Sequence, residues 1–106
     1  MSAAVVYVTM PDAEQAESLA RTVVEERLAA CGNILPGMTS VYRWEEEVQS
    51  AGECLLLFKT TRDRVTDLIA RVKELHSYDV PCITSWPISD ILPEYFQWIK
   101  ESTETP

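Results

Sequence analysis

Three thiols and one imidazole are the side chains best suited to metal chemistry in this sequence. Cys31, Cys54, Cys82 and His76 supply the ligand types that zinc and copper(I) bind. None of them are spaced as in a C-x₂₋₄-C or H-x₃₋₅-H motif, which disfavours a structural zinc site within one chain. His76 and Cys82 are six residues apart, and a short connection could bring them together. Because free cysteines are commonly buried, we predict that Cys54 belongs to the core.

Catalytic chemistry has less support in the residues. A nucleophilic thiol or hydroxyl needs a base in reach, and His76 is the only histidine; the sequence alone leaves a Cys–His pair open. Gly32, Gly37 and Gly52 are scattered and form no phosphate-binding loop. The run Glu45-Glu46-Glu47 could bind a hard cation weakly, but such a run is more typical of a solvated hairpin tip. We therefore predict a protein that is not an enzyme.

Composition limits the remaining function classes. The 106 residues suit a single domain over residues 1–106. Seventeen acidic and nine basic residues give a net charge of −8, which argues against binding to nucleic acid or to an anionic membrane. No apolar run approaches the roughly 18 residues of a membrane helix, and the first ten residues lack the features of a secretory signal. Three widely spaced cysteines favour a reducing compartment, so we predict a soluble cytoplasmic protein.

Hydrophobic periodicity predicts two helices that separate strands. Asp12 and Gln15 resemble a capping box, and apolar residues from Ala16 to Leu28 recur at helical spacing. The same pattern predicts a second helix over residues 65–75. Pro36 and Gly37 are expected to interrupt the chain before the next strand. Strands are expected at residues 3–9, around 41–44, at 53–60 and at 82–88.

Three finer expectations concern the second half of the chain. Residues 53–60 form the most apolar segment, which predicts a central strand buried on both faces. Pro87 lacks a ladder donor and therefore places its strand at an edge or ends it. A short C-terminal helix is expected from Pro93, followed by a frayed tail over residues 103–106.

The order of these elements indicates an α+β fold of the ferredoxin-like, split βαβ type. Strand–helix–strand occurs twice, which gives the order βαββαβ, an antiparallel four-stranded sheet with both helices on one face and the short C-terminal helix appended. The other face of the sheet is then left without cover. Apolar side chains on that face would be exposed in a monomer, so we predict an oligomer.

Five blocks of residues, in order along the chain, resemble the CutA family of divalent-cation-tolerance proteins. Each block is weak by itself, but the ordered set covers nearly the whole chain and is specific. The blocks are Leu28-Ala29-Ala30-Cys31 followed by Asn33-Ile34-Leu35-Pro36-Gly37, then Ser40-x-Tyr42-x-Trp44, Lys59-Thr60-Thr61, His76-x-Tyr78-x-x-Pro81 and Tyr95-x-x-Trp98.

The resemblance implies a ferredoxin-like subunit in a tight homotrimer, with long hairpin strands that reach neighbouring subunits and with clefts between subunits like those of PII signalling proteins. It also implies a link to metal ions, copper in particular. Cys31 matches the family cysteine proposed to contact copper, and His76 and Tyr78 match the H-P-Y block. Trp44 and Lys59 match residues expected near the intersubunit surface.

The sequence departs from the family pattern at three positions. Ser77 stands where the family usually has proline, and Cys82 stands where it usually has glutamate. Val8 replaces a first-strand cysteine that some members carry. A thiolate in place of a carboxylate at position 82 would favour softer ions such as copper(I).

Two functions follow as hypotheses. The first is a homotrimeric, non-enzymatic cytoplasmic protein that binds copper or other divalent ions through Cys31, His76 and Cys82, in or near an intersubunit cleft. The second is a PII-like signalling or scaffold trimer that binds a small ligand, such as an anion contacted by Lys59 and Arg43, or a protein partner. In both hypotheses the cleft or interface residues are expected to be Trp44, Lys59, Tyr78 and Trp98.

Overall fold

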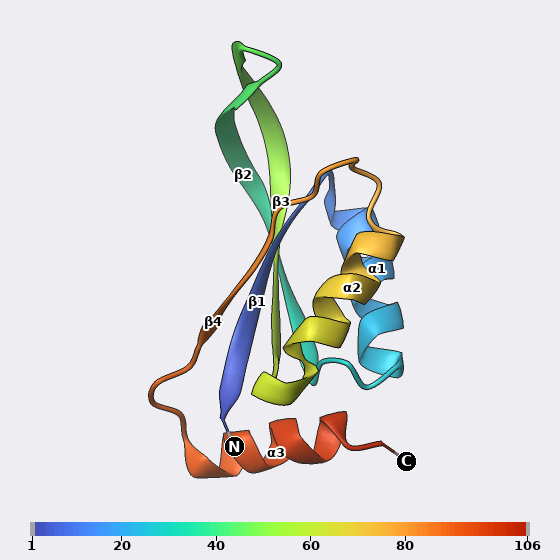
Figure 1. Ribbon diagram of the computed structural model, residues 1–106, viewed down its shortest axis with the longest axis vertical. Coiled ribbons are helices and arrows are strands. Elements are labelled where there is room, and N and C mark those ends of the chain that lie inside the picture. The colour runs from blue at the N-terminus through green and yellow to red at the C-terminus, as the bar shows by residue number, and fades with distance from the viewer. Residues whose placement is uncertain (1, 106) are drawn as a thin grey trace.

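A four-stranded antiparallel sheet with two helices on one face forms the body of the molecule, and the computed structural model describes residues 2–105 (Figure 1). The strands follow the order β2-β3-β1-β4 across the sheet, which confirms the predicted ferredoxin-like arrangement. The elements are β1 (Ala3–Met10), α1 (Ala13–Glu25), β2 (Cys31–Trp44), β3 (Glu47–Thr61), a 3₁₀ turn η1 (Arg62–Arg64), α2 (Val65–Leu75), β4 (Ile83–Pro87) and α3 (Pro93–Thr103).

The first helix begins and ends for local reasons. The backbone N–H of Gln15 donates to Asp12 Oδ1 at 2.8 Å, so Asp12 is the N-cap, as predicted. The helix ends at Glu25, and Arg27 adopts a left-handed backbone with φ of 61°. The apolar spacing that predicted the helix runs from Ala16 to Leu28, so it continues beyond the observed helix end. Leu28 lies after that end and still packs against the core.

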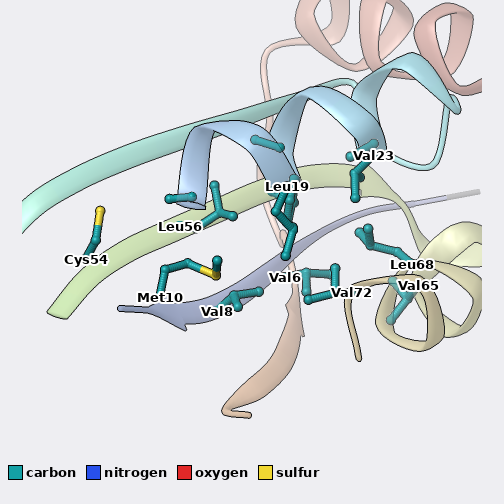
Figure 2. Packing of buried hydrophobic residues seen from close by; sticks show 14 of the residues in the cluster. Val6, Val8, Met10, Leu19, Val23, Cys54, Leu56, Val65, Leu68 and Val72 are labelled. Carbon is teal, nitrogen blue, oxygen red and sulfur yellow. The ribbon is translucent and has the colours of Figure 1, made fainter. Parts of the chain in front are cut away.

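The core lies between the two helices and the sheet (Figure 2). Alternate residues of β1 and β3 point toward α1 and α2, because side chains of a strand alternate between its two faces. Leu56 and Leu68 are fully buried there, and Cys54 is 1% exposed. The prediction that Cys54 belongs to the core is confirmed.

The prediction that residues 53–60 are buried on both faces was wrong for the single chain. Leu56 and Phe58 are fully buried on the helix side, whereas Leu55, Leu57 and Lys59 on the other side are only partly buried. The physical reason is that α1 and α2 both cover the same face (Figure 1). We call the opposite side, which displays these three residues of β3, the open sheet face.

Strands β2 and β3 extend beyond the rest of the sheet as a hairpin (Figure 1). Strand β1 ends at Met10, opposite Cys54, so the later part of the hairpin pairs only with itself. Glu45 and Glu46 form its tip with φ of 50° and 68°, which confirms the predicted acidic tip. The sequence predicted that Pro36 and Gly37 interrupt the chain before the next strand. They lie instead within β2, at a register shift between Leu35 and Met38.

The C-terminal helix packs across the end of the sheet near the N-terminus (Figure 1). Its Ile99 is fully buried against Ala3 and Ala30. The prediction of a frayed tail was wrong for Thr103, which is buried and whose carbonyl accepts a 2.7 Å hydrogen bond from Arg64 Nη2. Residue 106 lies outside the described residues. Strand β4 is an edge strand that ends at Pro87, as predicted.

Close packing of α1 on β2 at Gly32 leads to a stability prediction. A Cβ at position 32 would lie 3.1 Å from Ala20 Cβ and 3.2 Å from Phe58 Cε1. We expect Gly32→Ala to lower the free energy of unfolding by about 1–3 kcal/mol, as overpacking does, measured by chemical denaturation. Gly52→Ala is the matched control, because no described atom lies within 4 Å of its Cβ position. Equal stability of the two variants would contradict the prediction.

Candidate functional site

A thiol, an amide and three charged or aromatic side chains gather at the open sheet face. Cys31 begins β2 opposite Lys59 of β3, and its Sγ lies 3.6 Å from Tyr95 Oη of α3. Lys59 Nζ donates to Asn33 Oδ1 at 2.7 Å and lies 6.0 Å from the centre of the Tyr95 ring. The Tyr95 and Trp98 rings are 5.4 Å apart. We call these five residues the Cys31 cluster; it brings together the predicted Cys31, Lys59 and Trp98.

The chemistry of the Cys31 cluster favours a soft metal ion over a hard one. Burial and the contact with Cys31 raise the pKa of Tyr95 to about 12, so its phenol stays protonated at neutral pH. The positive charge of Lys59 disfavours a hard divalent cation nearby. The remaining metal-binding chemistry is that of a thiolate with a soft ion such as copper(I).

His76 lies elsewhere and is used by the fold. Its Nε2 lies 2.8 Å from the carbonyl oxygen of Thr9, and its Nδ1 accepts a 3.1 Å hydrogen bond from the backbone N–H of Tyr78. Because Nδ1 accepts, this pattern assigns the ring proton to Nε2, which donates to Thr9. Neither nitrogen keeps a free lone pair for a metal ion in this conformation.

The three predicted metal ligands do not meet within one chain. Cys31 lies opposite Lys59 of β3, which in turn lies opposite Val5 of β1, so the three residues form one row across the sheet. His76 contacts Thr9, four residues further along β1. At about 3.3 Å per residue, these rows are about 13 Å apart. Over residues 2–105, no group of three or more His, Cys, Asp or Glu side chains could hold a metal ion.

A groove between the projecting hairpin and the loop after α2 holds the other predicted residues. It has a volume of about 690 Å³, and we call it the hairpin groove. The predicted Trp44, Tyr78 and Cys82 line it, together with Tyr42, Glu53 and Asp79, which the sequence reasoning did not select. The spacing Tyr42-x-Trp44 places both rings on one face of a strand and could have indicated Tyr42. The register of the hairpin was needed for Glu53.

Tyr78 connects the two walls of the groove. Its Oη donates a 2.9 Å hydrogen bond to Glu53 Oε2 of β3, and its ring lies 4.7 Å from that of His76. The backbone bond to His76 fixes the start of the loop. The histidine therefore holds the tyrosine, and the tyrosine orients the glutamate.

This environment gives a prediction at alkaline pH. Burial, with the nearby Glu53 carboxylate, raises the pKa of Tyr78 from 10 to about 12. The neutral phenol therefore stabilises the fold fully below pH 10, and this contribution is lost as the pH rises to 12. We expect tyrosinate absorbance near pH 12 to decrease in Tyr78→Phe, with a shallower loss of stability between pH 10 and 12. Absorbance lost near pH 10 instead would contradict this assignment.

The fold and the site together define a ferredoxin-like α+β protein with a thiol and aromatic side chains on its uncovered side. The CutA1 divalent ion tolerance protein family matches residues 4–102. The divalent-cation tolerance protein CutA of Thermus thermophilus is 50% identical over 99 residues, spanning 93% of this chain and 96% of that protein. The chain therefore belongs to the CutA1 divalent ion tolerance family.

Further relatives agree in sequence and structure. The chloroplastic protein CutA of Arabidopsis thaliana is 46% identical over 93% of this chain and 54% of that protein. The crystal structure of CutA from Xylella fastidiosa superposes with a TM-score of 0.95 at 38% identity, over 98% of this chain and 100% of that chain. The solved structure of the Thermus thermophilus protein superposes with a TM-score of 0.92 at 49% identity, over 96% of this chain and 99% of that chain.

Family membership also bears on activity. CutA1 proteins are a family not known as enzymes, which confirms the prediction of a non-enzymatic protein. Within residues 2–105, no helix is long and apolar enough to cross a membrane. A structure from Archaeoglobus fulgidus is described as that of a periplasmic protein, and the Arabidopsis relative as chloroplastic. The cytoplasmic location of this chain stays a prediction.

Proposed function

We propose that this protein is a cytoplasmic homotrimer that binds copper or other divalent metal ions and contributes to their tolerance. The observation that carries the proposal is 50% identity to a divalent-cation tolerance protein over 93% of the chain. Its residues supply a partly buried thiol at Cys31 on the open sheet face, beside Tyr95 of α3.

The exposed apolar surface supports assembly. Leu35 and Trp86 on the open sheet face are 47% and 45% exposed, and Val41 and Val48 on the projecting hairpin are 70% and 66% exposed. Large apolar side chains exposed on the open sheet face and on the hairpin favour surfaces that another protein covers. A hairpin that leaves its own sheet is also well placed to contact a neighbouring subunit.

The metal ligands would then be completed between subunits. Cys31 is the primary thiolate, and the exposed Cys82 is a second thiol that a neighbouring chain can supply. His76 can join only if its ring gives up the bond to Thr9 or to Tyr78. Because thiols must lose a proton to coordinate, the affinity falls as the pH drops.

Native mass spectrometry with copper(I) under anaerobic, reducing conditions tests assembly and metal binding together. We expect a trimer with a defined number of ions, which a weak chelator does not remove. Cys31→Ser should abolish this binding, and Cys82→Ser should weaken it. Cys54→Ala is the control for a thiol that is buried in the core. Unchanged binding in Cys31→Ser, or a trimer that stays bare, would overturn the metal assignment.

A second candidate, a PII-like trimer that binds a small ligand, is supported by the hairpin groove. Its volume of about 690 Å³ lies in the range of small-molecule sites. Lys59 and Arg43, the anion contacts expected from sequence, are not among the residues that line it. Thermal-shift screening against small charged ligands tests this candidate, because a ligand that binds the folded form raises the melting temperature.

A further inference from the structure

The hairpin groove combines aromatic rings with negative charge. Tyr42, Trp44 and Tyr78 contribute three rings, and Glu53 and Asp79 contribute two carboxylates. Among the described residues that line the groove, there is no lysine, arginine or histidine. The lining therefore carries negative charge beside aromatic surface.

This combination selects one class of small ligand. An anion would be repelled by the two carboxylates, and an uncharged apolar ligand would cover them without balancing their charge. A bare metal ion lacks a converging set of three ligands in residues 2–105. A cation with apolar substituents satisfies both parts of the lining, because aromatic faces attract cations and carboxylates balance the charge.

The walls of the groove are also held in place before any ligand arrives. The 2.9 Å bond from Tyr78 Oη fixes one carboxylate oxygen of Glu53 and leaves the other without this bond. Tyr78 is in turn fixed by its backbone bond to His76, which is 9% exposed. Preorganised side chains lower the entropic cost of binding.

We infer that the hairpin groove binds an organic ammonium ion, with its charge balanced by Glu53 and Asp79 and its alkyl groups against the aromatic rings. This inference rests on the second candidate function and names its ligand class. It does not depend on copper, since an alkylated ammonium ion has no lone pair with which to compete for a metal and does not coordinate Cys31.

Calorimetric titration of the full chain, with a chelator present to remove metal, tests the inference. The probe is choline, and its neutral isostere 3,3-dimethylbutan-1-ol is the control for shape. We expect saturable binding of one choline per chain and at least tenfold weaker binding of the alcohol. No saturable binding of choline, or equal binding of both molecules, would overturn the inference. Preferential binding of inorganic phosphate would overturn it as well.

Variants separate the ring from the charge. Trp44→Leu should weaken choline binding about fivefold, the effect of losing a cation–π contact at a ring that is 44% exposed, whereas Trp44→Phe keeps a ring and should retain most of the affinity. Glu53→Gln should weaken binding about fivefold, which is the scale of one partly exposed ion pair. Glu25→Gln is the matched control, because Glu25 is an exposed residue at the end of α1 and does not line the groove. Equal losses in Glu53→Gln and Glu25→Gln would show general charge attraction and overturn the assignment.

The two proposals fail in different ways. Loss of copper binding in Cys31→Ser with choline binding retained leaves the groove inference intact. Loss of choline binding in Trp44→Leu with copper binding retained leaves the metal proposal intact. Circular dichroism of each variant establishes that the fold is kept, and a misfolded Trp44→Leu is replaced by Glu53→Gln.

Discussion

We expect Leu56→Ala to lower the free energy of unfolding by about 2–5 kcal/mol, the range for truncating a buried leucine. Leu56 lies in the middle of β3, is fully buried, and points toward the helices. The truncation would leave a cavity between a central strand and α1, in a region packed closely enough that a Cβ at position 32 would lie 3.3 Å from Leu56 Cδ1. Chemical denaturation at a fixed protein concentration measures the loss.

Leu57→Ala, the same change one residue later, is the matched control and also tests assembly. Leu57 points to the open sheet face and is only partly buried in one chain. If subunits cover this face, the variant should weaken assembly and make the melting temperature depend more strongly on protein concentration. Equal stability of Leu56→Ala and the wild type would contradict the observed burial. Unchanged assembly in Leu57→Ala would argue against an interface on the open sheet face.

The second large effect is expected at His76. In His76→Leu, the carbonyl of Thr9 and the N–H of Tyr78 both lose their partner. Both bonds are partly buried, so each loss costs about 1–2 kcal/mol, the lower part of the range for an unsatisfied group. We expect the free energy of unfolding to fall by about 2–4 kcal/mol for the pair, measured by urea denaturation with metal removed. His76→Gln, which keeps a donor and an acceptor, should recover part of the loss.

The outcome separates a structural role of His76 from a ligand role. A residue used by the fold lowers stability in the absence of any metal, and its loss also frees Tyr78, so the tyrosine should titrate at lower pH. A pure ligand would leave metal-free stability and the Tyr78 titration unchanged and would affect only copper affinity. The second pattern would contradict the geometry described here.

The hydrogen-bond pattern places His76 with the supports of the hairpin groove rather than with the Cys31 cluster. The two sites lie at different positions along the sheet, about 13 Å apart along β1 by strand rise. A metal ion at Cys31 and an organic cation beside Trp44 can therefore occupy one chain at the same time. Titrating choline in the presence of bound copper measures whether the two sites influence each other.

Sequence by itself determined the elements and their order. The apolar runs of β1 and β3 and the helical spacing in α1 and α2 are local patterns, and they predicted the ferredoxin-like arrangement. The tendency of free cysteines to be buried predicted the core position of Cys54, and the missing donor of Pro87 predicted an edge or end position. The ordered blocks around Cys31, Trp44 and Tyr78 also indicated the family. The elements follow from short-range periodicity and backbone preferences, which a single chain displays directly, whereas the family was indicated by resemblance alone.

Only the tertiary structure decided which side chains meet. Glu53 faces Tyr78 because a register shift near Pro36 and Gly37 sets the pairing of the hairpin. The ring nitrogens of His76 are occupied because the end of β1, at Thr9, lies close to the start of the loop after α2. Thr103 is buried, and its carbonyl accepts a hydrogen bond from Arg64. Each contact joins residues distant in sequence, and their positions depend on strand pairing and packing rather than on local pattern.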